Sequence, residues 1–115
     1  MAEAQNLEVK IDRMNGAVVL RPTGDIDLAR SPAFRREIMA AQGEKPGRVV
    51  IDLRDVPYMD SSGLATLVEA MQFSRKNSVP LVLCGMQQRV RGLFEIARLH
   101  TVFRIVPGVD EALVN

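Results

Sequence analysis

The fold of this chain is decided by one short stretch of its sequence, Val49-Val50-Ile51-Asp52-Leu53. This stretch is nearly continuously apolar and rich in β-branched side chains, which is typical of a central strand covered on both faces. The run Leu81-Val82-Leu83-Cys84 repeats the pattern, and a helix is expected between the two, from about Ser62 to Lys76. Its apolar stripe is Leu64, Leu67, Val68 and Met71. A strand, a helix and a second buried strand need a crossover connection, so the two strands are expected to lie parallel.

The residues ahead of this stretch predict a hairpin. Apolar and charged residues alternate over 7–11, which is the period-2 pattern of a half-exposed strand. The dipeptide Asn15-Gly16 is a strong tight-turn signal, and Ala17-Val18-Val19-Leu20-Arg21, which follows it, predicts a second strand. That strand is expected to end at Pro22, which has no amide hydrogen to donate to a ladder.

The remaining segments alternate between helix and strand. Ser31 is expected to cap a helix that has Pro32 at its first position and ends at Gln42-Gly43. A later helix is expected to place four residues on one face: Val90, Leu93, Phe94 and Ala97. Residues 103–106 predict an edge strand, and 109–113 a short closing helix. The prediction is a single α/β domain over residues 1–115, in which a hairpin opens a mixed, mostly parallel sheet and helices pack against it.

Composition and charge restrict the classes of function. The formal charge of +1 gives no electrostatic footprint for nucleic acid or for an anionic membrane surface. No apolar stretch approaches the roughly 20 residues that span a bilayer. The segment 1–6 carries an acid where a secretory signal would carry positive charge. One cysteine, Cys84, is compatible with a reducing compartment, so a cytoplasmic protein is expected.

The sequence offers little for catalysis or cofactor binding. The lone histidine, His100, is expected in a loop, and nothing orients it toward Ser61, Ser62 or Cys84. There is no nucleophile elbow, no zinc-ligand set, no calcium-loop spacing and no glycine-rich phosphate loop. The acids Asp52, Asp55 and Asp60 are interpreted as polar residues of strand ends and loops. We therefore expect a protein that is not an enzyme and that has no metal or other cofactor.

The segment Asp60-Ser61-Ser62-Gly63 lies where the loop after a buried strand leads into a helix. By itself it is an ordinary helix N-cap, in which a side-chain oxygen accepts a hydrogen bond from an unpaired backbone amide. Capping serines are common, so local chemistry favours a purely structural interpretation and leaves a functional one open.

The wider pattern resembles the STAS family, and more narrowly the bacterial anti-sigma factor antagonists. Three segments carry the resemblance: Gly24-Asp25-Ile26-Asp27-Leu28, Val49-Val50-Ile51-Asp52-Leu53, and Val56-Pro57-Tyr58-Met59-Asp60-Ser61-Ser62-Gly63-Leu64. They span nearly the whole chain in the family's element order, and Asp60-Ser61-Ser62-Gly63-Leu64 is the most specific of them.

The resemblance implies that Ser61, directly after the aspartate, is phosphorylated by a serine kinase that is also an anti-sigma factor. Unmodified protein would capture this partner and free the sigma factor, phosphorylation would release the partner, and a PP2C-type phosphatase would reset the protein. The partner-binding residues that the resemblance implies are Gly24, Asp25, Asp27, Asp60, Ser61, Ser62 and Gly63. No nucleic acid and no membrane insertion is implied.

Three alternatives remain at this level. Some proteins of this kind serve other partner-switching pathways or lipid-transport complexes, with no sigma factor as output. A phosphoaspartate receiver domain is also α/β and of similar length, but the sequence lacks its acidic pair after the first strand and its lysine after a later one. A hydrolase would need a base to activate the serine, and none is indicated.

Overall fold

The computed structural model describes residues 6–114. Residues 1–5, which hold most of the segment that argues against a secretory signal, lie outside the described residues, as does Asn115. The elements are β1 (Glu8–Met14), β2 (Ala17–Thr23), α2 (Ser31–Gly43), β3 (Arg48–Asp52), α3 (Ser61–Asn77), β4 (Leu81–Cys84), α4 (Gln88–Ile96), β5 (Arg104–Val106) and α5 (Val109–Ala112).

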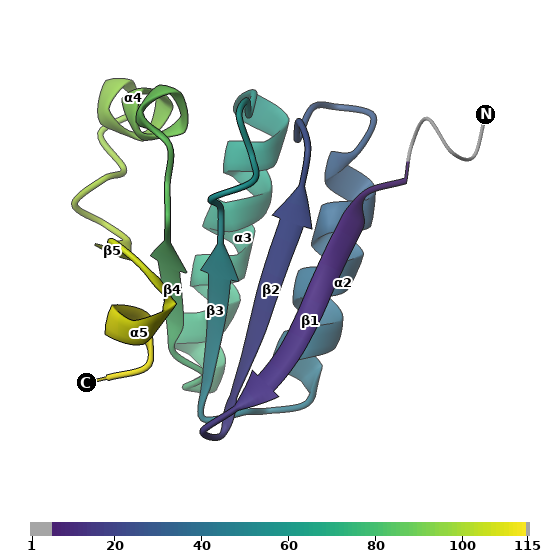
Figure 1. The fold of residues 1–115 in the computed structure, drawn as a ribbon, viewed down its shortest axis with the longest axis vertical. Coiled ribbons are helices and arrows are strands. Elements are labelled where there is room, and N and C mark those ends of the chain that lie inside the picture. The colour runs from purple at the N-terminus through teal and green to yellow at the C-terminus, as the bar shows by residue number, and fades with distance from the viewer. Residues whose placement is uncertain (1–5, 115) are drawn as a thin grey trace.

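The strands form one five-stranded sheet in the order β1-β2-β3-β4-β5. β1 pairs antiparallel with β2, and the other three pairings are parallel. The helices α2 and α3 cover one face, while the short α5 lies across β3 and β4 on the other (Figure 1). The predicted fold class is therefore confirmed, including the hairpin that opens a mostly parallel sheet.

The hairpin turn forms where the sequence predicts it, with Asn15 and Gly16 at φ 54° and 77° between the paired residues Met14 and Ala17. Positive φ at both central positions is the conformation of a type I′ turn, which matches the twist of the flanking strands. The second strand, however, runs through Pro22 to Thr23. The pairing of β2 with β3 ends at Leu20, so the missing amide of Pro22 costs that ladder no hydrogen bond.

The central strand is buried on both faces, as predicted, because Val49, Val50 and Ile51 have no exposed surface. Alternate residues of the strands divide the apolar side chains between two clusters. The larger cluster lies under α2 and α3 and includes Leu20, Ile51 and Phe34. The smaller one lies on the opposite face, where α5 supplies Ala112. The sheet thus lies between a large and a small layer. Because β2 to β5 are parallel, the loops that follow these strands lie at one end of the molecule.

Two helix predictions need correction. The N-cap of α2 is Arg30, and Ser31 is already the first helical residue. The preceding Asp27 supplies the capping carboxylate, since its Oδ1 accepts a hydrogen bond from the Arg30 amide at 3.0 Å. Ala97 is exposed at the C-cap of α4. Beyond it the chain turns back, and Phe103 packs edge-on against Phe94 with ring centroids 5.4 Å apart. Over residues 6–114, no helix is long and apolar enough to cross a membrane.

Candidate functional site

Two loops at the carboxyl end of the sheet are joined by backbone hydrogen bonds. The Gly24 amide donates to the Asp55 carbonyl at 2.9 Å, and the Ile26 amide donates to the Tyr58 carbonyl at 3.0 Å. The Asp60 amide in turn donates to the Ile26 carbonyl at 3.1 Å, and Ile26 and Met59 form a parallel bridge. The loop after β2 therefore lies beside the segment that begins α3. The structure brings together the two motif segments that the sequence keeps apart.

Gly63 is where this junction is tightest. A Cβ placed on Gly63 would lie 2.6 Å from Met59 Cγ, 2.9 Å from Ile26 Cγ2 and 3.2 Å from the Ile26 carbonyl oxygen. These separations are too short for carbon, so only glycine lets the first turn of α3 rest directly on the Ile26–Met59 bridge. Gly63 is buried, so within the predicted partner-binding region its role is to let α3 pack closely against Ile26 and Met59.

Asp60 is the N-cap of α3. Its Oδ1 accepts hydrogen bonds from the Ser62 amide at 2.9 Å and from the Gly63 amide at 3.4 Å, as well as from the Ser62 hydroxyl. The Ser62 hydroxyl is the main cause that lowers the pKa of Asp60 below its ordinary 3.8; partial burial opposes it, and the amides of Ser62, Gly63 and Leu28 also lower the pKa. The carboxylate therefore stays ionised at neutral pH, and in the described part of the chain it has no ion-pair partner.

The two adjacent serines have different roles. The Ser62 hydroxyl is half-buried and donates to Asp60, so it is committed to the cap. Ser61, at the first helical position, is exposed, and its hydroxyl makes no hydrogen bond within residues 6–114. The structure thus assigns one serine to the helix cap and leaves the other available to a partner.

The two acids on the neighbouring loop also differ from each other. Asp25 is exposed. Asp27 is half-buried, and its carboxylate is held by Arg30, through the amide at 3.0 Å and through the guanidinium at 3.6 Å. Asp27 therefore shapes the entry to α2, and part of its charge is neutralised by Arg30.

Two exposed apolar side chains flank the site and were not identified from the sequence. Leu28 is 75% exposed, and Tyr58 is 40% exposed with the Arg89 guanidinium 5.7 Å from its ring centroid. Both lie within the motif segments, but a leucine or tyrosine in a sequence carries no sign of its exposure. Arg89 is the second residue of α4, so the start of this helix lies beside the loop that carries Tyr58. Figure 1 shows the start of α4 at the same end of the molecule as the loops after β2 and β3.

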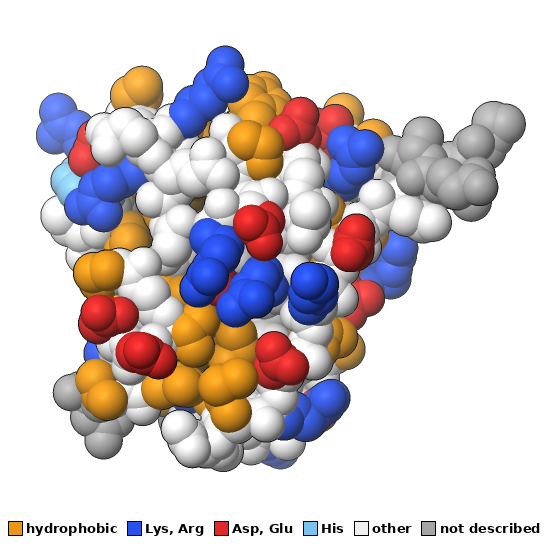
Figure 2. Space-filling view, in the orientation of Figure 1, with side chains coloured by type: hydrophobic (Ala, Val, Ile, Leu, Met, Phe, Trp, Pro, Cys, Tyr) orange, Lys and Arg blue, Asp and Glu red, His pale blue; other side chains and the backbone are white. Residues whose placement is uncertain are grey.

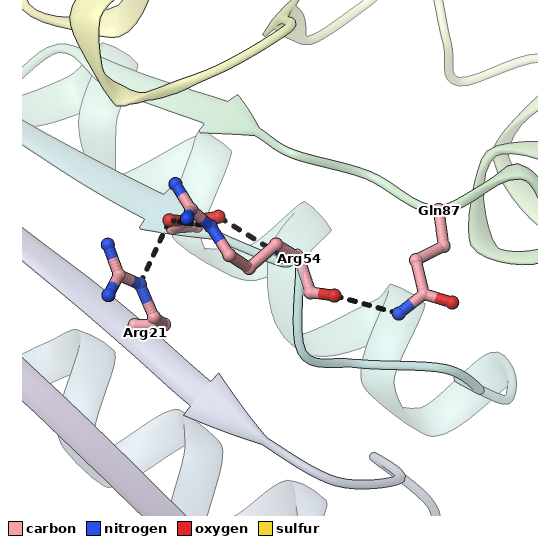
Figure 3. A network of polar contacts seen from close by, with 4 residues as sticks. Arg21, Arg54 and Gln87 are labelled. Atoms are coloured by element: carbon pink, nitrogen blue, oxygen red, sulfur yellow. Dashed lines mark hydrogen bonds and ion pairs between the residues drawn. The ribbon is translucent and has the colours of Figure 1, made fainter.

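Asp52 has a role that the sequence did not indicate. Its side chain is fully buried, and its Oδ2 accepts from Arg21 Nε and from Arg54 Nε, each at 3.0 Å. Its Oδ1 accepts from the Arg54 amide at 3.1 Å, and the Arg54 carbonyl accepts from Gln87 Nε2 at 2.8 Å (Figure 3). Basic side chains gather near the middle of this face of the sheet (Figure 2). Asp52 was interpreted as a polar residue of a strand end, and it is the last residue of β3. The sequence did not indicate that its carboxylate is buried and bound by two partly exposed guanidinium groups.

Other residues considered for chemistry do not converge on the serines. His100 lies in the loop after α4, as predicted, and its buried Nδ1 has no hydrogen-bond partner in the described chain. Burial, followed by the charge of Asp52, raises the pKa of Cys84 to about 12, so this thiol is unreactive at neutral pH. Within residues 6–114 no group of three or more histidine, cysteine or acidic side chains could hold a metal ion.

Comparison with known proteins identifies the family. Residues 8–112 match the STAS domain family. The anti-sigma-B factor antagonist of Listeria monocytogenes is 32% identical over 100 residues, which cover 87% of each chain. An anti-sigma factor antagonist from Mycobacterium paratuberculosis superimposes with a TM-score of 0.85, at 24% identity and with 95% and 92% of the two chains covered. The Bacillus cell fate determinant SpoIIAA, in its phosphorylated form, has a TM-score of 0.71 at 18% identity, with 92% and 96% covered. The architecture, the matched residues and the identity together show that this chain belongs to the STAS domain family, in its anti-sigma factor antagonist branch.

Proposed function

We propose that this anti-sigma factor antagonist is a partner-switching protein whose state is set at Ser61. Unmodified, it binds an anti-sigma factor that is also a serine kinase, and phosphorylation of Ser61 releases that partner. A phosphatase of the PP2C type restores the hydroxyl. Catalysis belongs to the kinase and the phosphatase, and this chain is their substrate. Because the output is transcription, the proposed location is the bacterial cytoplasm.

One observation carries the choice of Ser61. Its hydroxyl is exposed and free of hydrogen bonds, whereas the adjacent Ser62 hydroxyl is held by Asp60. A kinase must reach the acceptor oxygen and align it with a phosphoryl group, and releasing the Ser62 hydroxyl from Asp60 would cost about 1 kcal/mol, the net value of one hydrogen bond. The phosphorylated form of SpoIIAA supports the same kind of modification in a structural neighbour.

The environment of Ser61 explains how a phosphate would act without unfolding α3. A phosphoserine adds a charge of about −1.5 to −2, and a helix N-terminus favours a negative group by roughly 0.3–1 kcal/mol. The Ser62 and Gly63 amides already donate hydrogen bonds to the Asp60 carboxylate, which keeps its negative charge. The new phosphate would therefore stand beside a fixed carboxylate, exposed toward the partner.

The change in binding affinity that the switch requires indicates its physical cause. Changing occupancy decisively needs about 10²- to 10⁴-fold in affinity, or roughly 2.7–5.5 kcal/mol. Loss of one hydroxyl hydrogen bond supplies only about 1 kcal/mol. Steric and like-charge exclusion must supply the rest, against a partner surface that fits a neutral hydroxyl at Ser61.

The two serines provide a matched test. Incubation with the cognate kinase and ATP should add one phosphate to the wild type and to Ser62→Ala, and none to Ser61→Ala, as read by intact mass and fragmentation. In calorimetry Ser61→Ala should bind the kinase, while Ser61→Asp should bind at least about 100-fold more weakly. Phosphate on Ser62, or equal affinity of Ser61→Asp and wild type, would contradict the proposal.

A further inference from the structure

Within residues 6–114, the outer edge of β1 has no strand paired to it, and every second residue directs its backbone N–H and C=O groups outward. In the described part of the chain, β1 is the first strand of the sheet and pairs only with β2. Because a two-residue turn joins Met14 to Ala17, that pair is hydrogen-bonded, and such pairs alternate along the hairpin. The even-numbered residues of β1 thus bond to β2, while Val9, Ile11 and Arg13 direct their N–H and C=O groups away from the sheet. The pairing of Val9 with Pro22, which has no N–H, agrees with this alternation.

The charges along this edge are self-complementary about Ile11. Lys10 and Asp12 lie on either side of it and share one face of the sheet with their partners Arg21 and Val19. Ile11 points to the other face and is 41% exposed. When two copies of β1 run antiparallel with Ile11 opposite Ile11, each Lys10 lies opposite Asp12 of the other copy.

The two registers that are shifted by two residues from this one are repulsive. A shift of two residues one way sets Lys10 against Lys10 and Glu8 against Asp12, and a shift the other way sets Asp12 against Asp12. Like charges directly opposite each other destabilise a strand pair, and opposite charges contribute roughly 0.2–1 kcal/mol per pair. Edge strands commonly carry charges that prevent association, but among these three registers the one centred on Ile11 pairs opposite charges and is open to a second copy of the same chain.

We propose that two copies of this protein associate through β1, antiparallel and centred on Ile11, to form a continuous ten-stranded sheet. The Lys10–Asp12 contacts then fall at non-hydrogen-bonded positions, where opposing side chains are closest. The Ile11 side chains meet across the two-fold axis, and the outward backbone groups of Val9, Ile11 and Arg13 gain partners. Ser61 stays outside the contact, because α3 lies behind the middle of the sheet and β1 forms its edge (Figure 1). A single strand edge is small beside the roughly 800 Å² per partner of stable complexes, so the dimer is reversible and concentration-dependent.

Charge reversal tests the register directly. Sedimentation velocity of the full chain at low ionic strength, from about 10 µM to about 1 mM, should show a monomer–dimer equilibrium. Lys10→Asp and Asp12→Lys should each weaken self-association by about tenfold or more, because each converts two attractions into two repulsions. The double variant K10D/D12K should recover the dimer. An equimolar mixture of the two single variants should form a heterodimer, since every Asp then lies opposite a Lys.

Lys76→Asp, an equal change of charge at the exposed C-terminal end of α3, serves as the control and should leave the equilibrium unchanged. A wild type that stays monomeric throughout the range would overturn the proposal. A dimer that neither reversal weakens, or single variants that fail to pair when mixed, would overturn it as well. None of these readouts involves a kinase, so the result is independent of the function proposed for Ser61.

Discussion

Asp52 and Asp60 both follow the apolar residues of β3, but their environments are opposite. Asp52 is fully buried and accepts hydrogen bonds from two guanidinium groups and one amide. Asp60 is half-exposed, and within residues 6–114 its donors are uncharged, namely the Ser62 hydroxyl and backbone amides. A buried carboxylate needs neutralising charge, whereas a partly hydrated one can be held by hydrogen bonds alone.

This difference suits Asp52 to stabilising the fold and Asp60 to the proposed switch. The charge of Asp52 is neutralised within the protein, and its contacts tie β2, β3 and the loop after β3 together (Figure 3). The charge of Asp60 has no ion-pair partner among residues 6–114. In the proposed mechanism, a phosphate on Ser61 adds to a negative charge that the protein does not compensate, which is what a charge-based switch requires.

The largest expected effect on stability is at Asp52. Asp52→Ala would leave Arg21 and Arg54 without their carboxylate and would free the Arg54 amide. Removing one member of a buried ionic cluster costs about 3–5 kcal/mol, but both guanidinium groups can rehydrate here, so we expect a loss of about 2–3 kcal/mol. Urea unfolding would measure it. A loss no greater than that of Asp60→Ala would contradict the contrast drawn between the two aspartates.

The next largest effect is expected at Gly63, which supports the site containing Asp60. Gly63→Ala would force a methyl group into Met59 and Ile26. Overpacking of this kind costs about 1–3 kcal/mol, which outweighs the gain of about 1 kcal/mol in helix propensity. The control is Gly92→Ala in α4, where an added Cβ meets nothing within 4 Å and should not destabilise. Thermal unfolding of both variants would show whether the steric contact or the helix propensity decides the sign of the change in stability.

Removal of the cap itself should cost less. Asp60→Ala is expected to lose about 1 kcal/mol at pH 7, the usual value of an N-cap. The folded-state pKa of Asp60 is lowered, so its contribution is complete above the unfolded pKa and is lost as the pH falls through the folded one. The stability difference between wild type and variant should therefore shrink below about pH 4. A difference that stays constant down to pH 2 would show that the charge of Asp60 does not stabilise the helix.

The smallest effect concerns Cys84, the neighbour of Asp52 across the β3–β4 pair. Burial is the main cause of its raised pKa and the charge of Asp52 is the second, so Asp52→Asn should lower the pKa of this thiol without bringing it near neutrality. Alkylation by iodoacetamide at pH 9, followed by mass spectrometry, should be slow in wild type and modestly faster in the variant. Urea-unfolded protein provides the reference rate. A rate unchanged by Asp52→Asn would mean that burial alone protects the thiol.

Much of the fold could be predicted because local patterns and tertiary structure agree. The Asn15-Gly16 turn, the two buried runs around Ile51 and Leu83, and the apolar stripe of α3 specify a hairpin followed by strand–helix alternation. Two details were wrong, the first because of a local hydrogen bond and the second because of the path of the chain after α4. Asp27 supplies the carboxylate at the start of α2, so Ser31 is not the cap, and Ala97 is exposed because the chain turns back toward Phe94.

The sequence by itself determined the order of the elements, the turn chemistry and the segment that contains Ser61. These follow from periodicity and side-chain type, which act over a few residues. Only the tertiary structure decided which serine is free, which aspartate is buried and neutralised, and that the loop of Gly24 lies beside Asp60. The last two depend on contacts between residues distant in sequence, such as Arg21 with Asp52 and Ile26 with Gly63. The choice between the serines depends on which hydroxyl reaches Asp60 in the folded cap. Hydration, burial and charge compensation are properties of the packed molecule, and they give Asp52 and Asp60 opposite environments.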